Sequence, residues 1–111
     1  MEIQFSSQKT YKLFTNEKEL KKRHADVPFP VVKRRLEQMA AVACLDDLHF
    51  IMDTPILHLH KLTNRKDEFA VRVTAKKRII LEPDIQHPEI ENVNDLTTIT
   101  HIILKNIEDY H

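Results

Sequence analysis

The sequence TTITHII, residues 97–103, is dominated by β-branched side chains, which favour a strand buried in a sheet. It leads into IEDYH, residues 107–111, so a carboxylate, a phenol and an imidazole follow this strand closely. The ends of chains are usually frayed, and a loose tail is one interpretation of these residues. The other is that the strand anchors Asp109, Tyr110 and His111 well enough for them to take part in a reaction centre.

Composition indicates one globular domain over residues 1–111. The chain is 41% hydrophobic and 31% charged, which suits a single modest core. No apolar stretch approaches the roughly 18 residues of a membrane span, and the first residues lack a signal-peptide pattern, so we expect a cytoplasmic protein. The single Cys44 excludes an internal disulfide, and its apolar neighbours predict a buried thiol.

Glycine is absent from the chain. This excludes the glycine-rich phosphate loops of nucleotide-dependent kinases and dehydrogenases, and the glycine-flanked serine of many hydrolases. Turns that need a positive φ must therefore use asparagine or aspartate, and the candidates are Asn64, Asp67 and Asn92.

The net charge of zero hides a separation of charge along the chain. Between residues 58 and 81, seven Lys and Arg residues stand against two acids, a balance of +5. Between residues 82 and 111, seven acids stand against one lysine, a balance of −6. This pattern predicts either a cationic surface for a polyanion or charge pairing within the molecule.

Periodicity predicts an α+β fold in which two N-terminal helices pack on a mainly antiparallel, twisted sheet of four to five strands. The expected helices are residues 16–23, with Asn16 as N-cap, and a second helix that begins at Pro30 and extends to about Ala43. The expected strands are residues 1–5, 55–60, 68–74, 78–82 and a long terminal strand from residue 97.

The middle strands should form a hairpin. Residues 68–74 and 78–82 are close enough to pair, with Phe69, Val71 and Val73 facing inward. Pro83 should end this pairing, because proline cannot donate to a strand ladder. The acidic residues 84–95 should then form a surface excursion.

The histidines raise two kinds of chemistry. His58, His60, His101 and His111 lack any recognised metal-ligand spacing, so the sequence predicts no metal site. A metal-free ribonuclease fits better, because attack by the 2′-hydroxyl of RNA needs a base, a cation for the phosphorane charge and an acid. Histidine can fill either proton role, and arginine can hold two phosphate oxygens.

Three segments together resemble the HigB-type plasmid-maintenance killer toxins of the RelE/ParE superfamily. They are HKLTNRKDEFAV (60–71), RIILEP (78–83) and IEDYH (107–111). The helical segment 31–48 is also similar, so the resemblance covers nearly the whole chain. It implies a RelE/ParE-like toxin of a type II toxin–antitoxin system that cuts mRNA on the ribosome without a cofactor. It also implies a HigA-like helix-turn-helix antitoxin, through which alone the pair would bind operator DNA.

The same resemblance implies the roles of single residues. His60 and His111 would exchange protons or position the 2′-hydroxyl, Arg78 would neutralise the phosphorane, Asp109 would orient a neighbouring donor, and Tyr110 would stack on a base. The residues expected to contact messenger or ribosomal phosphates are Lys61, Arg65, Lys66, Lys76 and Lys77. The chain departs from the family at Thr63 and Asn64, where members often carry Lys-Gly.

Two functions are alternatives to a ribosome-dependent nuclease. They are a ParE-like gyrase inhibitor that acts by binding, and a small RNA-binding module without toxicity.

Overall fold

The computed structural model of the protein describes residues 1–48, 59–61, 67–86 and 95–109, with the backbone alone at 59–61. Its helices are α1 (Gln8–Thr15), α2 (Glu17–Arg23) and α3 (Phe29–Ala41). Its strands are β1 (Glu2–Phe5), β2 (Leu59–Lys61), β3 (Phe69–Arg72), β4 (Lys77–Pro83) and β5 (His101–Asp109). Short 3₁₀ turns form at Leu45–Asp47 and Leu96–Thr98. In these ranges no helix has the length and apolar character needed to cross a membrane.

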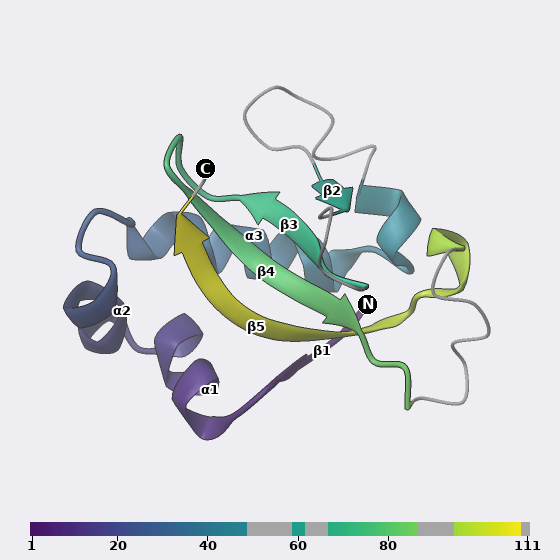
Figure 1. The fold of residues 1–111 in the computed structure, drawn as a ribbon, viewed down its shortest axis with the longest axis horizontal. Coiled ribbons are helices and arrows are strands. Elements are labelled where there is room, and N and C mark those ends of the chain that lie inside the picture. Colours follow the sequence, from purple (N-terminus) through teal and green to yellow (C-terminus); the bar gives the residue numbers. More distant parts are fainter. Residues whose placement is uncertain (49–58, 62–66, 87–94, 110–111) are drawn as a thin grey trace.

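The strands form one five-stranded mixed sheet in the order β1-β5-β4-β3-β2. β5 lies between β1, which runs parallel to it, and β4, which runs antiparallel. α3 passes behind the strands, and α1 and α2 lie toward the end of the sheet where β5 finishes (Figure 1). The predicted α+β class and the β3–β4 hairpin are confirmed.

The core lies between the helices and one face of the sheet. The inward prediction for Phe69, Val71 and Val73 is confirmed, because all three belong to this core. The fully buried side chains from the helices are Leu13, Phe14, Leu20, Val32 and Met39. Those from the central strands are Ile79, Leu81, Ile102 and Leu104, and Ile107 is buried beside them.

The prediction of two helices is wrong, because α1 adds a third. Its sequence, QKTYKLFT, contains β-branched and aromatic residues that lower helix propensity. One local and one tertiary feature compensate for this composition: the Ser7 side chain caps the helix by accepting a hydrogen bond from Thr10 N, and Leu13 and Phe14 are buried in the core. α3 begins one residue earlier than predicted, so that Pro30 is its second residue.

The terminal strand begins later than predicted, and this boundary was wrong. Asp95 accepts hydrogen bonds from the backbone N–H and the hydroxyl of Thr97, at 3.0 and 2.6 Å. This cap favours a 3₁₀ turn over Leu96–Thr98. The strand itself starts at His101 and runs to Asp109, while Tyr110 and His111 lie outside the described residues.

β5 contains a β-bulge. Ile80 pairs with Asn106, but its neighbour Leu81 pairs with Leu104, so Lys105 is an extra residue in β5. The bulge changes the alternation of the strand, because Leu104 and Ile107 both face the core although they are three residues apart. Thr10 on α1 supports the bulge, since its hydroxyl donates to the carbonyl of Lys105 at 3.4 Å.

Several single-residue predictions can also be judged. Asp67 has a φ of 57°, as expected for an aspartate that takes the usual place of glycine. Pro83 is the last residue of β4, which confirms that it ends the ladder. Cys44 is half-buried, so the prediction of a fully buried thiol is wrong. Of the predicted excursion 84–95, Ile85, Gln86 and Asp95 are exposed and Asp84 is buried, while residues 87–94 lie outside the described residues.

The cap of α2 gives a first test. Asn16 Oδ1 accepts from the backbone N–H groups of Lys18 and Glu19, at 3.0 and 3.2 Å. We expect Asn16→Ala to lower the free energy of unfolding by about 1 kcal/mol, because two helix-end donors lose their acceptor. Urea denaturation would measure this, with the exposed Lys18→Ala as control; equal midpoints for the two variants would contradict the capping role.

Candidate functional site

The sheet has two chemically different faces. One cross-strand row, Val71, Ile79 and Ile107, belongs to the core beneath the helices. Successive side chains in a strand point to opposite faces. The next row, Arg72, Arg78 and Glu108, therefore lies on the face away from that core.

Two arginines stand directly opposite each other in this second row. Arg72 on β3 pairs with Arg78 on β4, both are half-buried, and the Nε atom of each is buried. Like charges directly opposite in a sheet are destabilising. Glu108, next in the row, places one carboxylate beside Arg78. The row still carries two guanidinium groups, the group best suited to hold phosphate oxygens in a fixed geometry.

A second polar group lies on the helix side, where the β3–β4 hairpin meets the end of α2. Lys77 Nζ is 2.6 Å from Asp109 Oδ1, 3.4 Å from His24 Nδ1 and 3.9 Å from Asp26 Oδ1. The hydrogen bond to Asp109 raises the pKa of Lys77 above its usual value. Burial, followed by the positive charges of Lys77 and Arg23, lowers the pKa of His24.

The predicted site residues are thus distributed over both faces. Asp109 lies beside Lys77, whereas Arg78 lies on the opposite face of the sheet. Lys76 is exposed at the hairpin turn, as a phosphate-binding lysine should be, but the Lys77 side chain is only 14% exposed. The side chains of His60 and Lys61 on β2, and all of Arg65, Lys66, Tyr110 and His111, lie outside the described part of the structure.

The backbone nevertheless places position 60. His60 on β2 pairs with Ala70, which pairs with Ile80, which pairs with Asn106. This row lies two residues along the strands from the arginine row, on the same face of the sheet, and the core-facing row of Val71 and Ile79 lies between them. The expectation that His60 and Arg78 belong to strands of one sheet is therefore confirmed.

Sequence reasoning missed four residues of the first two groups: Arg72, Glu108, His24 and Asp26. Arg72 could have been found, because the inward residues Val71 and Val73 place it on the other face and a hairpin opposes it to Arg78. His24 carried no such signal. It is distant from β4 and β5 in sequence, and only the packing of α2 against the hairpin brings it to Lys77.

A third polar group lies on the arginine side of the sheet at the bulge. Lys105 Nζ contacts Glu68 at 2.9 Å and Glu82 at 3.4 Å. The Glu68 side chain is 9% exposed, so its carboxylate depends on neighbours within the protein. The hydrogen bond to Glu68 raises the pKa of Lys105.

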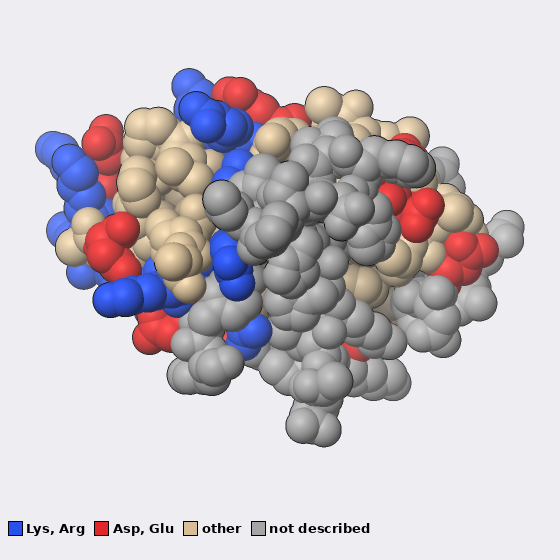
Figure 2. Space-filling model, turned by 90° about the horizontal axis from the view of Figure 1, so that it is seen from above, with Lys and Arg blue, Asp and Glu red and all other residues tan. Residues whose placement is uncertain are grey.

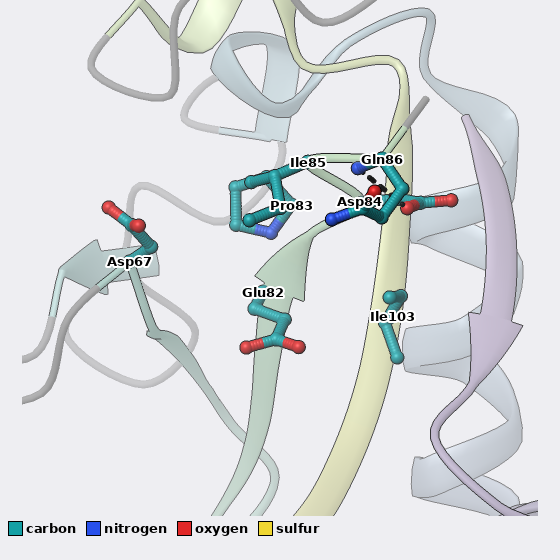
Figure 3. Close-up of a pocket in the computed structure, with 7 residues that line it drawn as sticks. All are labelled: Asp67, Glu82, Pro83, Asp84, Ile85, Gln86 and Ile103. Atoms are coloured by element: carbon teal, nitrogen blue, oxygen red, sulfur yellow. Dashed lines mark hydrogen bonds between the residues drawn. The ribbon is translucent and has the colours of Figure 1, made fainter. Parts of the chain in front are cut away.

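The far end of β4 borders a cavity of about 390 Å³ (Figure 3). Its lining residues are Asp67, Glu82, Pro83, Asp84, Ile85, Gln86 and Ile103. The three carboxylates point in different directions, and Asp84 accepts from the backbone N–H of Gln86. In the described ranges no three or more His, Cys, Asp or Glu side chains are grouped so that they could hold a metal ion.

Charge is unequal across the face of the molecule that Figure 2 shows. Seen from above, described Lys and Arg atoms lie in the left half of the surface, which holds α2 and the β3–β4 turn. The right half shows acidic atoms and no described Lys or Arg atoms (Figures 1 and 2).

Comparison of the chain with protein-family models, with curated proteins and with solved structures found no match. A functional assignment therefore depends on the sequence segments and the geometry of these groups.

The bulge group can be tested by removing its cation. We expect Lys105→Met to lower the free energy of unfolding at neutral pH by about 1–3 kcal/mol, because the buried Glu68 carboxylate loses a charged donor. Chemical denaturation would measure the loss. Glu68→Gln combined with Lys105→Met should recover part of it; a double variant no more stable than Lys105→Met would contradict this explanation.

His24 makes stability depend on pH. Because the unfolded chain binds the His24 proton at a higher pH than the folded protein, acidification through the usual histidine pKa of about 6.5 favours unfolding. The wild type should therefore lose more stability than His24→Gln between about pH 7.5 and pH 5.5. The melting temperature of each protein at each pH measures the difference. An equal fall in melting temperature for the two proteins would refute the prediction.

Proposed function

We propose that this chain is the toxin of a type II toxin–antitoxin system, with a RelE/ParE-like fold and the activity of a ribosome-dependent mRNA endonuclease. Support comes from the order of the HKLTNRKDEFAV, RIILEP and IEDYH segments. The described residues of these segments include parts of β2 and β3, most of β4 and the end of β5, which belong to one sheet.

The observation that carries the proposal is the cross-strand pair of Arg72 and Arg78 on the sheet face away from the core. RNA cleavage by the 2′-hydroxyl builds negative charge on a phosphorane, and guanidinium groups in a fixed row can stabilise that charge. Position 60 on β2 pairs with Ala70, which is two residues before Arg72, and β5 extends as a strand to Asp109. One candidate proton-transfer residue, His60, thus comes from the strand beside β3, and the other, His111, follows the described end of β5 by two residues in the sequence.

The proposed reaction needs no metal and no redox partner. The 2′-oxygen attacks the adjacent phosphorus, the bond to the 5′-oxygen breaks, and the products are a cyclic phosphate and a 5′-hydroxyl. His60 and His111 are the proposed proton carriers, and Arg78 with Arg72 would hold the phosphate oxygens. The ribosome would supply orientation of the messenger, a contribution worth up to roughly 7–11 kcal/mol of barrier in favourable cases.

The proposed partner is a HigA-like helix-turn-helix antitoxin, which would neutralise the toxin and confer operator binding on the pair. A short adjacent reading frame that encodes such a protein would support this part of the proposal. Co-expression of the two proteins should restore growth and yield a complex that is stable through purification.

The central experiment is induction of the chain in growing cells. We expect growth arrest and mRNA cuts phased with the reading frame in a primer-extension map, both relieved by Arg78→Ala and by His111→Ala. Lys12→Ala on α1 removes an exposed charge elsewhere and should remain toxic. Circular dichroism would show that the variants are folded.

The other outcomes separate the alternatives. Full toxicity in both Arg78→Ala and His111→Ala would reject the catalytic assignment. DNA damage without mRNA cuts would indicate a gyrase inhibitor on the same scaffold. Harmless overexpression of a protein that binds RNA would indicate a binding module without toxicity.

A further inference from the structure

Lys77 lies where three elements meet: the start of β4, the end of β5 and the end of α2. It pairs in register with Asp109, the last described residue of β5. His24, which contacts the Lys77 ammonium, is the C-cap of α2 and is held there by a 2.7 Å hydrogen bond from its backbone N–H to Leu20 O. A single side chain thus connects elements that are distant in sequence.

The end of β5 needs such a connection. β1 pairs with β5 only as far as Leu104, so within the described residues the strand beyond the bulge is paired with β4 alone. In Figure 1 the tip of β5 extends past β1 toward the hairpin turn. Strand ends held on one side open locally at low free-energy cost.

The backbone of Lys77 is fixed by its turn. Thr74 Oγ1 accepts from the backbone N–H groups of Lys76 and Lys77, at 3.2 and 3.0 Å. The carbonyl of Lys77 accepts from Val73 N and Thr74 N, at 3.0 and 3.2 Å. The Lys77 side chain therefore extends from a backbone position that hydrogen bonds fix on both its N–H and its carbonyl.

Lys76 and Lys77 are adjacent in sequence but differ in environment. Lys76 is exposed, whereas the Lys77 side chain is 14% exposed and its ammonium lies among His24, Asp26 and Asp109. Lys77 therefore has little surface to offer to a phosphate. Because Asp109 is 62% exposed, the ion pair adds little to global stability, but it restrains the residue that precedes Tyr110 and His111.

We propose that Lys77 is a positioning residue that fastens the end of β5, through Asp109, to the hairpin and to α2. The consequence for cleavage rests on the proposed function: the two residues after Asp109 act on RNA only while this strand end is held. Lys77 would then serve the reaction without contacting the substrate, in contrast to Lys76.

Amide hydrogen exchange on the full chain tests the fastening without any assumption about function. Lys77→Met should speed exchange at residues 106–109 by up to about fivefold, because the strand end opens more often once the ion pair is lost. Exchange at Leu81, which pairs with Leu104 on the other side of the bulge, should stay unchanged. The matched control, Lys76→Met, should leave residues 106–109 protected, and Lys77→Arg should restore protection. Equal protection in Lys77→Met and Lys76→Met would overturn the proposal.

Cleavage on translating ribosomes tests the consequence. Lys77→Met should lower kcat by up to about 100-fold with little change in KM, as expected when catalytic groups are misplaced rather than substrate binding lost. Lys76→Met should instead raise KM. A rise in KM for Lys77→Met that matches Lys76→Met would mean that Lys77 contacts RNA, which overturns the positioning role. If the wild type cuts no mRNA, the proposed function fails, while the exchange experiment still decides whether Lys77 fastens β5.

Discussion

The extra residue Lys105 in β5 is the constraint on which the arrangement of the site depends. A bulge shifts the alternation of a strand by one residue, so every later side chain changes face. Without it, Asp109 would share a face with Arg78; with it, Asp109 lies beside Lys77 and Glu108 lies beside Arg78. Thr10 accommodates the displaced backbone by donating to the carbonyl of Lys105.

The basic residues of the cationic segment and the acidic residues of the terminal segment come together in the sheet, and the bulge decides which of them meet. Lys105 and Lys77 each bind carboxylates within the protein, which is charge pairing. Arg72 and Arg78 form a row on the face away from the core, which is the arrangement expected of an anion-binding surface. Charge pairing within the molecule is therefore found on both faces of the sheet, and the arginine row is the part of the charge pattern on which the proposed anion binding depends.

Local signals predicted the parts of the fold that local chemistry controls. Asn16 as a cap, Asp67 at positive φ, Pro83 as the end of a ladder and the hairpin between β3 and β4 all follow from short-range preferences. Predictions failed where burial in the core or a side-chain cap outweighed those preferences. α1 forms despite weak propensity because Leu13 and Phe14 are buried, and the TTITHII run begins as a 3₁₀ turn because Asp95 caps it.

The sequence by itself determined the α+β class, the alternating core residues of the hairpin and the residue types of the candidate site, since these depend on periodicity and side-chain chemistry. The tertiary structure alone decided the parallel pairing of β1 with β5, the bulge at Lys105 and the contact of Lys77 with His24. Such features join residues far apart in the chain, and their energies come from packing and pairing that no local stretch of sequence contains.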